Sequence, residues 1–297
     1  MPIHDQGYRR YGGKRAPHGR AWLIIARTHM LAAFKFRSFV ILLLASWLPF
    51  VARGVQIYLS SSFQQVSMLA ATAQTFRDFL DQQGLFVFLV TIALGGAIAD
   101  DRRANALQLY LSKPLTRTEY IIGRLVPVLA CLLGVTFLPA ILLVLLQVAF
   151  SGSTAFLSQN LFLVPAITLV SLTQSLLSAC TILALSSLSK SRRFVSVMYA
   201  GIIFFTAAMY QVLRAITGSR AWAAISPGDM IDVVADAVFR IRATPPVPVL
   251  VAALVIAVLI AASIWILERK VRPVETLRER DCHRAPLEVV RPGLRPE

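Results

Sequence analysis

Six long apolar stretches limit what this chain can fold into. Together they hold 138 of the 297 residues but only two of the 45 charged residues, Arg53 and Arg214. About 20 apolar residues are enough to cross a bilayer, and charge is costly at bilayer depth. The sequence therefore predicts an all-α polytopic membrane protein with six transmembrane helices, and it excludes a soluble enzyme, a coiled coil and a disordered chain. The predicted spans are Ser38–Leu59, Gln83–Ala99, Leu125–Phe150, Leu161–Leu188, Phe194–Thr217 and Val247–Leu267.

Composition agrees with this class. Apolar residues make up 57% of the chain and the mean hydropathy is +0.67, whereas soluble domains are about 45–50% apolar. Cys131 and Cys180 fall inside apolar stretches and Cys282 in a charged tail. This spacing supports neither a disulfide framework nor a zinc site, and we expect no metal and no cofactor.

The basic residues predict an orientation. The N-terminal tail, residues 100–124, residues 189–193 and the C-terminal tail hold 24 Lys and Arg, and the opposite segments hold 6. By the positive-inside rule the first set is cytoplasmic, which places both termini inside the cell and the chain in the cytoplasmic (inner) membrane. A net charge of +15 could also suggest a nucleic-acid partner. We favour no nucleic acid, because the basic residues are divided among loops beside the membrane, where anionic lipid suffices as a partner.

Charged and helix-breaking residues within the spans are few. Arg53 and Arg214 fall near the outer ends, where a long side chain can reach the headgroups; a substrate contact is the less favoured interpretation. No Asp, Glu, Lys or His lies deep in a predicted span. Ion-coupled carriers usually need such groups, so we expect the driving energy to come from elsewhere. Kinks are expected at Pro49, Pro139 and Pro165.

Four regions follow: a basic cytoplasmic tail (1–19), an interfacial helix (20–37), the six-span domain (38–267) and a charged cytoplasmic tail (268–297). Residues 7–15 superficially resemble a phosphate loop, but the spacing to Lys14 is wrong and no Ser or Thr follows it. We therefore expect no ATP site in this chain. One face of the interfacial helix is predicted to be apolar, formed by Trp22, Ile25, Ala26, His29, Ala33 and Phe36; His29 is expected to pack there rather than to bind a ligand.

The segment between the second and third spans reads DDRRANALQLYLSKPLTRTEYIIGR, from Asp100 to Arg124. Asp101 is expected to cap a short helix that Pro114 ends. Thr116 and Glu119 have the spacing of a capping box, which predicts a second helix starting at Arg117 and running into the third span. The short helix would then carry both charges and exposed leucines, which suits it to receive a partner protein.

This segment resembles the cytoplasmic signature of type-2 permease subunits of ATP-binding cassette (ABC) transporters. Ala104 and Asn105 stand where family members often have glycine and threonine, and Arg124 replaces the usual lysine. The resemblance implies two permease chains, identical or related, acting with two separate ATP-binding subunits, and no catalytic residue in this chain. It implies an ATPase-coupling interface at Asp101, Arg102, Arg103, Leu107, Tyr110, Leu111, Pro114 and Arg117, and it rests also on Ser112, Tyr120 and Gly123.

The predicted outer loop before the last span contains a further helix. Ser226 as N-cap, Pro227 and Asp229 form its start signal. Asp229, Asp232 and Asp236 share one face, and the apolar side is formed by Met230, Val233, Val234 and Ala237. The acids could form a calcium or cationic-substrate site. The favoured alternative is stabilisation by the helix dipole, with Asp236 pairing with Arg240.

The fourth span is rich in polar side chains: Thr168, Ser171, Thr173, Gln174, Ser175, Ser178 and Thr181. They could line a polar path, although hydrogen bonding between packed helices is the favoured interpretation. The function expected from the whole sequence is that of an ABC transporter permease subunit that moves an unidentified substrate. The alternatives are a membrane-bound lipid-processing enzyme and a secondary carrier.

Overall fold

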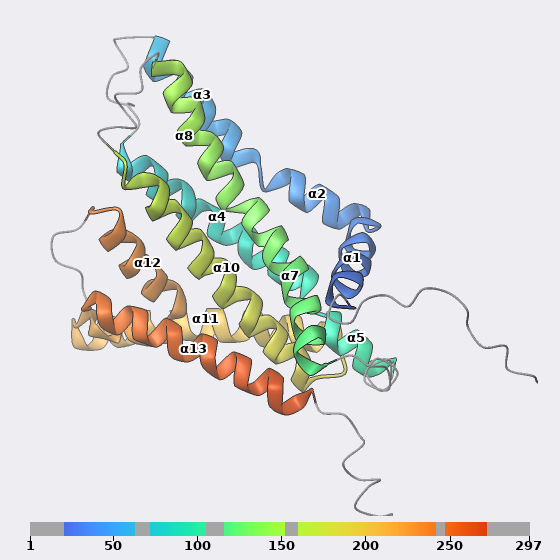
Figure 1. Cartoon of the computed structure of the whole chain (residues 1–297). Coiled ribbons are helices and arrows are strands. Elements are labelled where there is room, and N and C mark those ends of the chain that lie inside the picture. Colours follow the sequence, from blue (N-terminus) through green and yellow to red (C-terminus); the bar gives the residue numbers. More distant parts are fainter. Residues whose placement is uncertain (1–20, 63–71, 105–115, 152–159, 242–246, 272–297) are drawn as a thin grey trace, which may run out of the picture.

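The computed structural model describes residues 21–62, 72–104, 116–151, 160–241 and 247–271. In these ranges the chain is helical and contains no strand (Figure 1). The predicted tails 1–19 and 268–297 fall outside the described residues, apart from the end of the last helix and Val271. The α-helices are α1 (Ala21–Phe34), α2 (Arg37–Ala45), α3 (Leu48–Ser62), α4 (Ala73–Leu94), α5 (Ala97–Arg103), α7 (Arg117–Val135), α8 (Phe137–Ser151), α10 (Leu163–Leu188), α11 (Arg192–Thr217), α12 (Pro227–Val238) and α13 (Val249–Lys270), with a 3₁₀ helix, η2 (Arg220–Ile225).

Six helical segments are long and apolar enough to cross a membrane, which confirms the predicted fold class. They are Arg37–Ser60, Ala73–Arg103, Arg117–Phe150, Leu163–Leu188, Arg192–Thr217 and Val249–Lys270. The second begins ten residues before the predicted Gln83. Its first turns carry Arg77, Asp78 and Asp81, and the apolar pattern therefore left them outside the predicted span. In the structure Arg77 forms ion pairs with Asp232 and Asp236 of α12.

Two of the three prolines interrupt their spans as predicted. A proline lacks the N–H that would bond the carbonyl four residues earlier. Helix α2 ends at Ala45, four residues before Pro49, and α7 ends at Val135, four residues before Pro139. Pro165 instead lies in the first turn of α10, where no such bond is required, and the 26-residue helix continues without interruption to Leu188.

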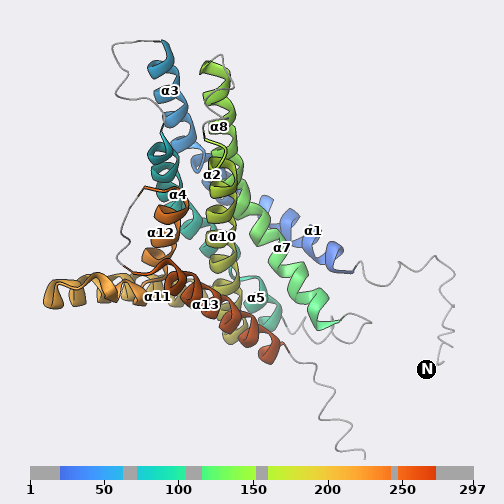
Figure 2. The ribbon, with the colours of Figure 1, turned by 60° about the vertical axis from the view of Figure 1, so that its left-hand side comes forward.

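Helix α10 is the centre of the bundle and packs against α4, α5, α7, α8, α11, α12 and α13. Helices α11 and α13 lie at the periphery. In the most apolar part of each helix, only 17% of the residues are buried within the chain. Figure 2 shows α11 running outward from the bundle, away from the α3–α8 pair. The bundle has two ends, which we name by the acids they hold: the Asp101 end and the Asp232 end.

The N-terminal helix α1 packs against α7. Ile25 and Ala26 of the predicted apolar face are buried, and Ile25 belongs to one small buried cluster with Tyr120 and Val271. Phe36 does not belong to that face, because α1 ends at Phe34 and Phe36 is 58% exposed.

Candidate functional site

Asp101 organises one end of the bundle. The residue lies inside α5 rather than before it, so the predicted role as a helix N-cap is wrong. Its Oδ2 atom accepts a 2.6 Å hydrogen bond from the Tyr120 hydroxyl and a second bond from Nη2 of Arg124. The Asp101 and Arg124 side chains are 14% and 9% exposed. A largely buried carboxylate is thus neutralised by a largely buried guanidinium, and the pair joins α5 to α7.

The start of α7 sets the position of these partners. The predicted capping box is present, because Oγ1 of Thr116 accepts from the Glu119 backbone N–H and Oε2 of Glu119 accepts from the Thr116 N–H at 3.0 Å. The predicted start at Arg117 is confirmed. Tyr120 and Arg124 are four residues apart and therefore lie on one face of α7, toward α5.

Helix α5 is also bound to the central helix. The hydroxyl of Ser186 accepts a 2.9 Å bond from the Ala99 backbone N–H, and the Arg102 guanidinium donates to the backbone carbonyl of Ser187. Arg192 of α11 lies 3.8 Å from the Asp100 carboxylate and donates to the carbonyl of Ala93. The α4–α5 junction is close to these helices, since a Cβ at Gly95 would meet Ile182 and one at Gly96 would meet Arg192.

The structure places four of the eight predicted coupling residues. We call the contact of Asp101 with Tyr120 and Arg124 the frame. Asp101 belongs to it and Arg102 joins α5 to α10 beside it, whereas Arg103 and Arg117 are exposed on either side of segment 105–115. The other four predicted coupling residues, Leu107, Tyr110, Leu111 and Pro114, lie outside the described residues. The sequence pattern predicted no site role for Tyr120 and Arg124, nor for Arg192, which lies beside the frame. Their spacing from Asp101 carries no local signal that would have paired them.

His29 lies beside this frame. It lines a cavity of about 690 Å³ together with Thr28, Phe39, Asp100, Asp101, Arg124 and Arg192. Burial, followed by the charges of Arg124 and Arg192, lowers the pKa of His29 to about 4. The imidazole is therefore neutral at pH 7, which avoids a further positive charge beside two arginines.

Helix α12 at the other end starts as predicted. The Ser226 hydroxyl accepts from the Asp229 N–H at 3.4 Å, with Pro227 at the first helical position. Met230, Val233 and Val234 are buried, as the predicted apolar face requires. This packing turns the acidic face of α12 toward the start of α4.

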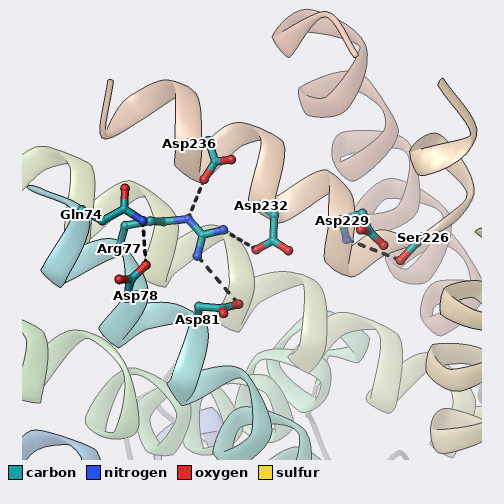
Figure 3. Close-up of polar contacts among 8 residues, drawn as sticks. All are labelled: Gln74, Arg77, Asp78, Asp81, Ser226, Asp229, Asp232 and Asp236. Atoms are coloured by element: carbon teal, nitrogen blue, oxygen red, sulfur yellow. Dashed lines mark hydrogen bonds and ion pairs between the residues drawn. The ribbon is translucent and has the colours of Figure 1, made fainter. Parts of the chain in front are cut away.

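Arg77 of α4 lies between these acids (Figure 3). Its Nη2 donates to Oδ1 of Asp232 at 2.8 Å and its Nε to Oδ1 of Asp236 at 3.0 Å. Asp81, one turn along α4, approaches Nη1 at 3.8 Å. The Arg77 side chain is only 10% exposed, so this contact fastens α12 onto α4.

The structure differs from two sequence-based expectations for the acidic face of α12. The ion-pair partner that the structure gives Asp236 is Arg77, while the guanidinium of Arg240, the expected partner, lies 5.0 Å from the centre of the Phe162 ring. The cation between the acids is a side chain of the same protein. Among the described residues, no group of three or more His, Cys, Asp and Glu side chains has an arrangement suited to a metal ion.

Desolvation in this cluster raises the pKa of Asp232 to about 6. Arg77 opposes the rise, and the neighbouring carboxylates of Asp81, Asp229 and Asp236 add to it. Asp229 and Asp236 also share a second pocket with Arg214 and Arg220. Arg214, which was expected to reach the lipid headgroups, therefore also has acidic side chains in the pocket that it lines.

The structure supports the packing interpretation of the polar fourth span at one position. Ser171 and Ser175 are both fully buried, and Ser175 lies 3.5 Å from the Thr136 hydroxyl, as hydrogen bonding between packed helices predicts, whereas the Ser171 hydroxyl has no hydrogen-bond partner among the described residues. Gln174, Ser178 and Thr181 lie on another side of α10 and line a cavity of about 400 Å³.

No protein-family model matches the chain, and no curated protein matches it.

Proposed function

We propose that the chain is the permease subunit of an ABC transporter, moving its substrate with ATP hydrolysed by a separate subunit. The observation that carries this proposal is the Asp101–Tyr120–Arg124 frame. It lies at the base of the segment that resembles the type-2 permease signature. Asp101 and Tyr120 match that signature, and Arg124 stands at the position where the family usually has lysine. The six-span fold and the N-terminal helix packed on the third span agree with the same family.

The frame offers a path for mechanical coupling. Segment 105–115 joins α5 to α7, and the contacts of Asp101, Arg102 and Ala99 connect these helices to α10. Arg192 continues the path from α5 to α11. A partner that displaces segment 105–115 would therefore move several spans together, because charged and buried contacts resist separate movement.

The assembly that we propose contains two ATP-binding subunits and a second permease chain, identical or related. The Asp101 end faces the cytoplasm, where ATP is available, and the Asp232 end faces outward across the inner membrane. The 24-to-6 division of basic residues supports this orientation. The sparsely buried α11 and α13 leave apolar surface for lipid and for the second chain.

Leucine substitutions in the signature segment test the coupling. Leu107→Asp and Leu111→Asp place a charge in an apolar contact, at a cost of about 2–4 kcal/mol if the contact is central. We expect membrane insertion to persist while transport and substrate-stimulated ATP hydrolysis are lost. Gln159→Asp, in the opposite set of loops, is the control and should be tolerated. Normal assembly and transport by both leucine variants would contradict coupling through this segment.

One observation favours a secondary carrier as the second candidate. The carboxylate of Asp232 contacts the buried Arg77 at 2.8 Å and lines the cavity beside α10, and desolvation raises its pKa to about 6, an arrangement that an acid on a proton path can have. The two functions differ in energy source. A carrier would transport in liposomes that contain this chain alone under an imposed pH gradient, whereas the permease subunit would require the ATP-binding subunit and ATP.

A further inference from the structure

The cavity of about 400 Å³ beside α10 has an elongated lining. It is bounded by side chains of α4, α10, α11, α12 and α13. On α10 its lining extends from Val170 to Leu188, which at 1.5 Å per residue is about 27 Å. This approaches the roughly 30 Å thickness of a bilayer's hydrocarbon core. The cavity therefore suits a long, narrow apolar group better than a compact one.

Charge is confined to one end of this lining. Arg77, Asp81 and Asp232 are its charged members, and all three belong to the Asp232 end. Toward the Asp101 end the lining is uncharged and mostly apolar, for example Leu185, Leu188 and Ile266. A ligand that fills such a cavity needs a polar head at one end and a hydrocarbon tail.

The sign of the head follows from the carboxylates. Of the three acids that contact Arg77, Asp81 and Asp232 line this cavity and Asp236 does not. Both lining carboxylates remain accessible: Asp81 stays 3.8 Å from Arg77 with 66% of its side chain exposed, and Asp232 is 47% exposed. Figure 3 shows the two carboxylates approaching the guanidinium from different helices. An anionic head would meet two like charges here, whereas a cationic head would gain two partners.

Arg214 and Arg220 line the second pocket, which Arg77 and Asp232 also line together with Asp229 and Asp236. Neither arginine belongs to the lining beside α10, whereas Asp81 belongs to that lining alone. On the tail side, Gln174, Ser178 and Thr181 form a polar stripe that can accept an ether, amide or ester group partway along the ligand.

We propose that this cavity binds a single-chain amphiphile with a cationic head, the head between Asp81 and Asp232 and the tail along α10. Binding requires this chain alone. That the amphiphile is the transported substrate rests on the proposed permease function.

The test is photolabelling of the purified full chain in nanodiscs of zwitterionic lipid. The probe is a dodecyl quaternary ammonium compound with a diazirine in its tail, and the matched probes carry a sulfate or a phosphocholine head. We expect saturable labelling by the cationic probe of peptides from α10, α11 and α13, and much weaker labelling by the other two. Equal labelling by all three, or crosslinks confined to helices that do not line the cavity, would overturn the proposal.

Two pairs of variants locate the head and the tail. Asp81→Asn and Asp232→Asn should each reduce the apparent affinity for the cationic probe by about tenfold. Asp78→Asn, on α4 but outside the lining, should bind like the wild type. Ala262→Phe fills the cavity and should block labelling, whereas Ala261→Phe, outside the lining, should not.

Asp81→Asn keeps the inference testable if Asp232→Asn loosens α12, because Asp81 is the weaker partner of Arg77. Unchanged affinity in Asp81→Asn, or in a folded Asp232→Asn, would overturn the placement of the head. Site-specific labelling of a chain that co-purifies with no ATP-binding subunit from its native membranes would refute only the permease function. ATP-coupled transport without labelling of this cavity would refute only the inference.

Discussion

At the scale of single residues, one oxygen atom organises the Asp101 end. Oδ2 of Asp101 accepts from both Tyr120 and Arg124, and Arg124 is 8% exposed. Removing the carboxylate leaves a buried guanidinium without its counter-charge, which is the costly way to break a buried pair.

Asp101→Asn should therefore lower the free energy of unfolding by about 3–5 kcal/mol. Asp100→Asn is the matched control: its side chain is 52% exposed and lies 3.8 Å from Arg192, so its loss should cost about 1 kcal/mol or less. Equilibrium unfolding in mild detergent measures both. Equal losses in the two variants would show that the frame contributes no special stability.

Asp232 gives a pH dependence of defined sign. Its pKa rises from 3.8 to about 6 on folding, so between these values the folded chain holds a proton that the unfolded chain has released. Stability from Asp232 is complete below about pH 4 and is lost as the pH rises through 6. His29, whose pKa falls to about 4, acts in the opposite direction over an overlapping range.

Comparison of the wild type with Asp232→Asn isolates the effect, because His29 is present in both. Melting temperatures should be measured from pH 4.5 to 7.5. The melting temperature of the variant should increase relative to that of the wild type as the pH rises. Parallel curves for the two proteins would contradict the raised pKa of Asp232.

At the scale of elements, the features that could be predicted are local ones. The caps at Thr116 and Ser226 and the breaks before Pro49 and Pro139 depend on residues within four positions of each other. Arg77 and Asp232 are 155 residues apart, and no pattern along the chain pairs them. The early start of α4 was missed for the same reason, since Arg77 in its second turn is paired by Asp232 and Asp236 of α12, far along the chain.

The contact between α1 and α7 gives an element-scale prediction. A Cβ at Gly123 would lie 3.0 Å from Cβ of Ile25 and from the backbone oxygen of Trp22, whereas one at Gly134 would meet nothing within 4 Å. Gly123→Ala should therefore be less stable than Gly134→Ala by about 1–3 kcal/mol. Hydrogen exchange of α1 amides should quicken only in Gly123→Ala. Equal exchange in both variants would mean that α1 is not held by this contact.

At the scale of the whole molecule, the distribution of basic residues predicts which end of each spanning helix faces the cytoplasm. Ser191 and Ser219 flank the two ends of α11, and both are exposed. In a chain whose native cysteines are replaced by serine, Ser219→Cys should react with an impermeant thiol reagent added outside intact cells and Ser191→Cys should not. The reverse pattern would invert the proposed topology.

The central claim is that this chain works with a separate ATP-binding subunit. Its most direct test is to purify the tagged full-length chain from its native membranes, identify the co-purifying proteins and measure ATP hydrolysis with and without them. We expect an ATP-binding subunit in equal amount to the permease chains, and hydrolysis that disappears when that subunit is stripped away. Purification with no nucleotide-binding partner, or ATP hydrolysis by this chain alone, would show that it is not such a permease subunit.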